Sequence, residues 1–165
     1  MIVVSNTSPI TNLSAIQKID ILRQLYGVLI IPQAVYNEMV DLPYEVPGSE
    51  EVQTLSWIQT RQATNRSLVA ELRLEIDAGE SEAIALAIEL NANRLLIDDY
   101  QARVIASRFG LKFTGILGLL LAAKKQGLIT AVKPIVDDLI NQAGFRVSDR
   151  LYREIVQMAD EVLEE

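Results

Sequence analysis

Polar side chains follow three short apolar runs of this sequence, at the points where strands would end. Asn6 follows the run IVVS, Asp98 and Asp99 follow LLI, and Thr114 follows LKF. The carboxyl ends of parallel strands meet at one edge of a sheet, and ligands of open α/β sheets bind outside that edge. We therefore expect these side chains to lie at a common edge. A simpler alternative is that Asn6 and Thr7 only form a turn, because Asn bonds readily to nearby backbone.

Two glutamates on predicted helices are further candidates. Glu38 lies near the carboxyl end of the predicted helix PQAVYNEMV, and Glu80 begins a predicted helix directly after Gly79. Each has a structural alternative. A glutamate in the first helical turn is stabilised by the helix dipole, so Glu80 could be only a capping residue. Glu38 could be a solvated helical position.

The residue types that are absent narrow the chemistry. The sequence contains no histidine and no cysteine. This excludes a Ser-His-Asp triad, a histidine general base, a cysteine nucleophile and an ordinary zinc site. Carboxylate and amide oxygens remain, and they suit hard cations. The sequence therefore predicts that any catalysis uses acidic residues that hold Mg²⁺ or Mn²⁺.

Length, hydropathy and charge restrict the class of protein. With 165 residues, half of them hydrophobic, we expect a single domain that spans 1–165. No apolar run approaches the roughly 20 residues of a membrane span. The start MIVVSN also lacks the basic residues of a signal peptide, so we expect a cytoplasmic protein. The net charge of -7 argues against a broad nucleic-acid surface but permits a small active site for nucleic acid.

Short apolar runs alternate with helical periods along the chain. This pattern predicts an α/β fold, a three-layer sandwich around a mainly parallel sheet with right-handed crossovers. Ser8 is the expected N-cap of a first helix that starts at Pro9. The loop DLPYEVPGSE should separate two helices, and residues 130–165 should form a C-terminal helical extension. The expected strands are 2–5, 28–31, 57–62, 95–97 and LKFTG; the expected helices include 9–16, 19–26, 32–40, 80–90, 100–109, 116–125 and 131–142.

Several segments, taken in order, carry a resemblance to a known family. They are VVSNTSPI, IIPQAVYNEM, GESEAIALAIEL, RLLIDDYQAR and LKFTGILGLLLAAKKQGLI. Together they resemble the PIN-domain family, and more narrowly its prokaryotic VapC-like branch, which carries a domain-of-unknown-function label. The resemblance covers nearly the whole chain. It implies a metal-dependent nuclease, because many prokaryotic members are ribonuclease toxins that a small partner protein neutralises.

The resemblance also assigns roles to residues. It places the family's four acidic positions on Asn6, Glu38, Glu80 and Asp98, which would be both the catalytic residues and the ligands of Mg²⁺ or Mn²⁺. Its supporting positions fall on Thr7, Ser8, Asp99, Arg103 and Thr114. The first acid is replaced by the amide of Asn6. An amide oxygen can still bind Mg²⁺, but one full charge is lost, so we expect weaker metal binding.

These patterns support two functions of different classes. The first is a metal-dependent endoribonuclease, the toxin of a toxin-antitoxin pair, with RNA as substrate and a small antitoxin as partner. The second is a non-catalytic PIN-like module that binds RNA or protein. A receiver-type phosphoacceptor at LLIDD is a weaker third interpretation, because its acidic pair would come late in the chain. The apolar helix GILGLLLAAKK indicates a homodimer or a hetero-complex.

Overall fold

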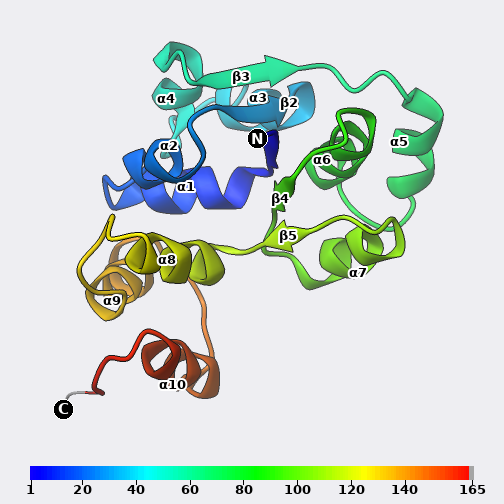
Figure 1. The fold of residues 1–165 in the computed structure, drawn as a ribbon. Helices are drawn as coiled ribbons and strands as arrows, with labels where there is room; N and C mark the ends of the chain where they lie inside the picture. The colour runs from blue at the N-terminus through cyan, green and yellow to red at the C-terminus, as the bar shows by residue number, and fades with distance from the viewer. Residues whose placement is uncertain (164–165) are drawn as a thin grey trace.

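A five-stranded sheet, parallel throughout, forms the middle layer of the protein (Figure 1). The computed structural model describes residues 1–163. The strand order is β3-β2-β1-β4-β5. The strands are β1 (Val3–Ser5), β2 (Leu29–Pro32), β3 (Ile58–Arg61), β4 (Arg94–Leu96) and β5 (Phe113–Thr114). All five strands that the alternating pattern predicted are present, and WIQTRQ supplies the predicted edge strand β3.

Helices cover both faces of the sheet, which makes the three-layer α/β sandwich that the sequence predicts (Figure 1). One side carries α1 (Thr7–Ala15), α2 (Asp20–Tyr26), α8 (Ile116–Lys125) and α9 (Lys133–Gln142). The other carries α5 (Arg66–Leu72), α6 (Ala78–Glu89) and α7 (Tyr100–Arg108). α3 (Gln33–Val40) and α4 (Ser49–Thr54) pack beside β3, and α10 (Asp149–Met158) completes the described chain.

The strand order places a topological switch between β1 and β4. The chain runs outward in one direction through β1, β2 and β3, and in the other through β4 and β5. Ser5 is paired with Leu96, and the backbone N–H of Asn6 donates to the carbonyl of Leu96 at 3.0 Å. The residues that follow β1 and β4 therefore lie side by side at the carboxyl edge. This crevice is the position at which open α/β sheets bind ligands.

Three predicted helix starts are wrong by two residues: α9 begins at Lys133 instead of residue 131, whereas α1 and α6 begin earlier than predicted. The N-cap of α1 is Asn6 rather than Ser8, so Ser8 lies inside the first turn, where its hydroxyl accepts a hydrogen bond from Asn12 at 3.0 Å. In α6 the N-cap is Asp77, and Gly79 is helical instead of breaking the chain. In α1 and α6 a short polar residue, two positions before the expected one, occupies the extended N-cap position.

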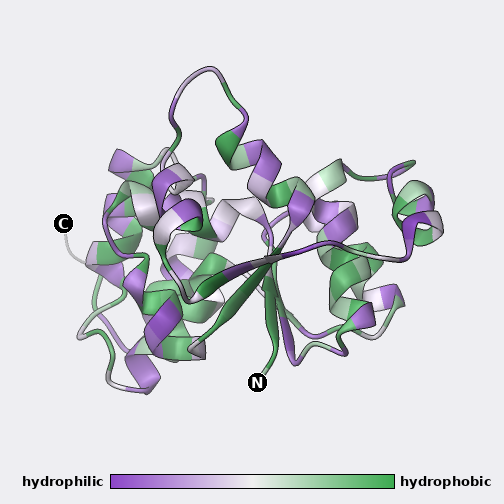
Figure 2. Ribbon diagram, turned by 90° about the horizontal axis from the view of Figure 1, so that it is seen from above, coloured by the Kyte–Doolittle hydropathy of each residue, from purple (hydrophilic) through white to green (hydrophobic). Residues whose placement is uncertain are grey.

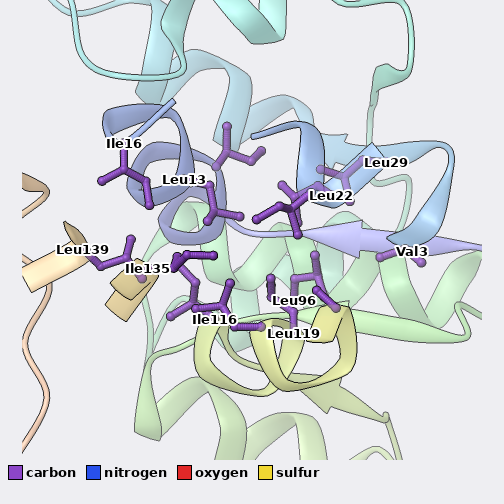
Figure 3. Close-up of a cluster of buried hydrophobic side chains, with 14 of the residues drawn as sticks. Val3, Leu13, Ile16, Leu22, Leu29, Leu96, Ile116, Leu119, Ile135 and Leu139 are labelled. Atoms are coloured by element: carbon purple, nitrogen blue, oxygen red, sulfur yellow. The ribbon is translucent and has the colours of Figure 1, made fainter. Parts of the chain in front are cut away.

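Two apolar cores lie on the two faces of the sheet. Val3, Leu29 and Leu96 point to the face covered by α1, α2, α8 and α9 (Figure 3). Val4, Ile30 and Leu95 point to the face covered by α5, α6 and α7. This alternation explains why the central strands β1 and β2 are nearly continuously hydrophobic, green in Figure 2, since neither face of these strands is open to solvent. The edge strand β3 is mostly polar, and Gln59 and Arg61 are exposed.

The C-terminal segment contains two helices, α9 and α10, and α9 packs directly into the core. Val132, Ile135 and Leu139 are buried in the same core as α1 and α8, so α9 is part of the packed domain. α10 is capped by Ser148, whose hydroxyl accepts the N–H of Leu151 at 3.1 Å. The last two residues of the predicted 130–165 extension lie outside the described residues.

Beyond α10, a carboxylate connects the chain back to α9. The carboxylate of Glu161 accepts the backbone N–H groups of Val132 and Lys133, at 2.6 and 2.8 Å, and pairs with Lys124 at 2.9 Å. We call this set of contacts the Glu161 clasp. It satisfies otherwise unpaired N–H groups at the start of α9 with a negative charge, the sign that a helix N-terminus favours.

Candidate active site

Asn6 lies at the carboxyl end of β1 and is buried, with 7% of its surface exposed. It is the N-cap of α1, yet its side chain makes no capping hydrogen bond. Its Oδ1 lies 3.3 Å from the position that a Cβ on Gly79 would occupy. The amide is thus directed toward the start of α6 and does not close its own turn, which disfavours a purely local role.

Gly79 brings Glu38 next to Asn6. A Cβ at Gly79 would overlap Oε2 of Glu38, so only glycine allows this carboxylate to approach the first turn of α6. Although much of the Glu38 side chain is exposed, its carboxylate end lies against Gly79 and near Asn6. Desolvation, together with the negative charges of Asp77 and Glu82, raises the pKa of Glu38 to about 7. The hydroxyl of Thr7 offsets part of this rise.

Glu80 occupies the third position of α6. Its backbone N–H donates to Oδ1 of the N-cap Asp77 at 2.8 Å. Burial raises the pKa of Glu80 to about 7, with further contributions from Asp77, Asp99 and Glu38, while the backbone N–H of Asp77 lowers it. The capping role considered above is therefore present, and in addition Glu80 lies within the field of the neighbouring acids.

Asp98 lies two residues beyond the end of β4, at the switch point, whereas its neighbour Asp99 is the N-cap of α7. Its Oδ1 accepts the backbone N–H of Ile116 at 3.0 Å, and its Oδ2 accepts the Ser8 hydroxyl at 3.5 Å. Burial raises the pKa of Asp98, while the contacts to Ile116, Arg103 and Ser8 lower it. Asp98 is thus held between the starts of α1 and α8.

The remaining supporting residues surround Asp98. Asp99 caps α7 through a hydrogen bond from the N–H of Ala102 at 2.9 Å. Arg103 pairs with Asp98 at 3.7 Å rather than with Asp99, donates to the carbonyl of Ile97 and stacks over Phe113. Thr114 lies in β5, level with Leu96, and the carbonyl of Thr114 accepts the N–H of Ile97 at 3.0 Å.

Two acids that the sequence reasoning missed shape the site. Asp77 caps α6 and raises the pKa values of both Glu38 and Glu80. The spacing D-A-G-E, which fits a capping box, could have revealed it. Glu82 is 6% exposed; it accepts the N–H of Ala34 at 3.0 Å and pairs with Arg66 at 3.1 Å, so it fixes the start of α3 against α6. No sequence signal distinguished this buried glutamate from its neighbours.

The donors of the crevice can be tested for their fit to a divalent cation. As the side chains lie, no group of three or more acidic residues in the described range 1–163 could hold an ion without moving. The chemistry nevertheless fits: the donors are oxygens only, Glu38 and Asn6 meet at Gly79, and crowded carboxyl groups call for a positive charge. Oγ1 of Thr7, which lies near enough to lower the pKa of Glu38, is also buried there and makes no hydrogen bond of normal geometry to a described residue.

Comparisons with known proteins identify the family. The family model DUF3368, described as a PIN domain, matches residues 2–161. No curated protein matches the sequence. Within residues 1–163, none of the helices has the length and hydropathy to cross a membrane. Because the match extends over nearly all of the chain and agrees with the parallel three-layer architecture, this protein belongs to the PIN-domain family.

Proposed function

We propose that this protein is a Mg²⁺- or Mn²⁺-dependent endoribonuclease, the toxin of a toxin-antitoxin pair in the VapC-like branch, acting on RNA in the cytoplasm. Membership of the PIN-domain family implies a nuclease-type function, nucleic-acid binding and the general use of divalent metals. The finer assignment to RNA, to a toxin and to these two cations is our inference.

One observation carries the proposal. Oxygen donors from four separate segments follow β1 and β4 or lie at the start of α6 and the end of α3, and, in addition to burial, repulsion from the charge of Glu38 raises the pKa of Glu80. Asn6 and Glu38 meet at Gly79, Glu80 lies in the field of Glu38, and Asp98 lies beside Ser8 at the end of the neighbouring strand. Acidic groups with raised pKa values are uncommon on a surface that has only a structural role, and they cluster at functional sites.

In this proposal the residues of the site have separate roles in cation binding, orientation and phosphate binding. Glu38, Glu80, Asp98 and Asn6 would hold the cation, which when bound supplies Lewis-acid stabilisation of the phosphate and activation of water. The N–H of Ile116 fixes the direction of the Asp98 carboxylate. Arg103, partly exposed beside Asp98, offers a guanidinium to the phosphate oxygens.

The same crevice suggests how an antitoxin would act. A cluster of acids attracts a basic side chain, so we propose that a small partner inserts an arginine or lysine between Glu38, Glu80 and Asp98 and thereby excludes the cation. Titration of Mn²⁺ with and without the native partner tests this mode. Equal affinity for Mn²⁺ in the two cases would contradict it.

The activity is tested by incubating the purified protein with single-stranded RNA and Mn²⁺, beside Asp98→Ala and Asp98→Asn. Glu71→Gln is the matched control, because Glu71 is exposed on α5 and its side chain makes no hydrogen bond or ion pair among the described residues. We expect cleavage by the wild type and by the control, and at least a hundredfold loss in both Asp98 variants. Equal cleavage by all four proteins would point to a contaminating nuclease.

A second candidate is a non-catalytic module that binds RNA or protein in the same crevice. The amide of Asn6 in place of an acid, and the lack of a ready-made group of three acids among the described residues, favour it. Binding of RNA without cleavage at any concentration of Mn²⁺ or Mg²⁺ would support this candidate and contradict the nuclease.

A further inference from the structure

A cavity of about 790 Å³ opens beside the acidic crevice. β5 and α8 form one wall and α10 forms another, with the end of α2 closing the far side. Figure 1 shows α10 lying below α8, away from the sheet. Asp98 and Arg103 belong to both the crevice and the cavity, so the two are continuous. The volume lies in the range of sites that bind small organic ligands.

The charge of the cavity is opposite to that of the whole protein. Its charged lining, among the described residues, consists of Arg94, Arg103, Arg146 and Asp98. Asp98 is already paired with Arg103, whereas Arg94 and Arg146 have no salt-bridge partner among residues 1–163. In a chain of net charge -7, this local excess of positive charge selects for an anionic ligand.

The remaining walls of the cavity are apolar and aromatic. Leu117 and Leu121 of α8 face Leu151 and Met158 of α10 across it. The last two are 39% and 67% exposed, so they offer apolar surface to whatever enters the cavity. A ligand that fits must therefore combine an anionic group with a flat or apolar body.

The length of the cavity matches such a ligand. Arg94 begins β4 and Asp98 follows its end, so the lining spans about 13 Å along this strand at 3.3 Å per residue. Gly115 keeps the end near the crevice open to Arg103, because a Cβ there would overlap the guanidinium and lie 2.7 Å from Oδ1 of Asp98. Arg103 is thus presented at the boundary between acids and cavity.

We propose that this cavity binds one nucleotide of a single-stranded RNA, next to the phosphate that lies at the acidic crevice. The phosphate of that nucleotide lies at Arg103. Its base lies between α8 and α10, and Arg94 and Arg146 hold the polar edges of the nucleotide. This inference rests on the proposed function, which it deepens by assigning a substrate subsite to the C-terminal helix.

The test is calorimetric titration of nucleoside monophosphates into the full chain, in EDTA, so that neither metal nor cleavage is involved. Inorganic phosphate and the uncharged nucleosides are the comparison probes. We expect a nucleoside monophosphate to bind at least tenfold more tightly than either. Arg146→Gln should weaken binding at least fivefold, and Ala122→Phe, which fills the cavity from α8, should abolish it.

Controls and outcomes separate the alternatives. Arg150→Gln is matched to Arg146→Gln, because Arg150 is exposed at the start of α10 and does not line the cavity. Thermal melts establish whether Ala122→Phe is folded, and the exposed Arg146 carries the test if it is not. Equal affinity for phosphate and nucleotide, or equal loss in both arginine variants, would overturn the subsite. Saturable binding of an apolar dye but not of nucleotide would also overturn it, in favour of a protein-docking groove.

The subsite and the nuclease can fail separately. Nucleotide binding in EDTA without RNA cleavage in Mn²⁺ would leave the subsite and reject the nuclease. Cleavage of RNA with an unchanged KM in Arg146→Gln, and no binding of monophosphates, would do the reverse.

Discussion

Replacement of Glu80 by glutamine tests whether the carboxyl groups of the crevice destabilise the metal-free protein. Burial, together with Asp77, Asp99 and Glu38, raises the pKa of Glu80 from its usual 4.5 to about 7. A group whose pKa is raised in the folded state favours folding most below its unfolded pKa, near 4.5. That contribution is lost as the pH rises through the folded value, about 7. The wild-type protein should therefore lose stability between pH 5 and pH 8.

The size of the effect follows from the pKa values. A change from 4.5 to about 7 corresponds to about 3 kcal/mol, which is an upper bound. Solvent reaches part of the Glu80 side chain and screens these charges, so we expect about 1 to 2 kcal/mol. Glu80→Gln keeps the size and polarity of the side chain and removes the charge. It should match the wild type at pH 5 and be more stable by this amount at pH 8.

Urea denaturation in EDTA at several pH values between 5 and 8 measures the difference. Glu71→Gln on α5 is the control and should change the free energy of unfolding by less than about 0.5 kcal/mol at every pH. A Glu80→Gln variant that is no more stable than wild type at pH 8, or whose advantage does not grow with pH, would refute the crowding of charges.

Addition of Mn²⁺ should make the wild type more stable than Glu80→Gln, the reverse of their order in EDTA. A cation that binds only the folded state stabilises it by about 2.7 kcal/mol at a hundredfold excess over Kd. Glu80→Gln lacks one charged ligand, so Mn²⁺ should stabilise it less than it stabilises the wild type. If Mn²⁺ stabilises neither protein, the metal site is wrong, while the result in EDTA still stands.

The remaining predictions concern three other residues. Asn6→Asp places a carboxylate beside Glu38, which should lower the stability of the metal-free protein by up to about 3 kcal/mol and raise both Mn²⁺ affinity and RNA cleavage. Thermal melts with and without Mn²⁺ and a cleavage assay measure these effects; lower stability at every Mn²⁺ concentration without added activity would favour the binding module. Asp77→Asn retains a good N-cap but removes the charge that raises two neighbouring pKa values, so NMR titration should show the pKa values of Glu38 and Glu80 falling; unchanged values would exclude Asp77 as their cause. Glu161→Gln should cost about 1 to 3 kcal/mol. Burial raises the pKa of Glu161, but the N–H groups of α9 and Lys124 outweigh this effect, so the pKa is lowered overall. In the wild type the stability from Glu161 is therefore present at neutral pH and lost as the pH falls below about 4. Equal acid sensitivity of the variant and the wild type in urea melts would contradict this.

Local signals were sufficient to predict the sheet. Most strands are short apolar runs between turn residues, and a strand buried on both faces needs no longer-range information to be recognised. β3 was recognised instead by the alternation of apolar and polar residues in WIQTRQ. The helix α8 was predicted with its observed bounds, because Gly115 and Gly127 frame a continuous apolar period. The starts of α1 and α6 were missed, because several adjacent polar residues can each serve as N-cap and tertiary contacts decide between them.

The geometry of the site depends on contacts that the sequence does not encode locally. Gly79 was interpreted as a helix breaker, whereas it is the point at which Glu38 approaches α6. Glu82 is buried because Ala34 and Arg66 meet it from distant parts of the chain. The apolar face of α8 was interpreted as a partner surface, yet Leu119 and Leu120 are buried in the core and Leu117 and Leu121 line the cavity. A homodimer or hetero-complex therefore remains a prediction without that support.

The Glu161 clasp has a consequence for how the protein opens. It joins the residue beyond α10 to the first turn of α9, so the segment between them is a ring closed by one carboxylate. α10 contributes few side chains to the core, mainly Ile155, Val156 and Ala159. When the clasp breaks, α10 can detach while the sheet and the acidic crevice stay folded. Amide hydrogens of α10 should then exchange with solvent together and far sooner than those of β1 and β4, which makes the helix a separate unit of local unfolding.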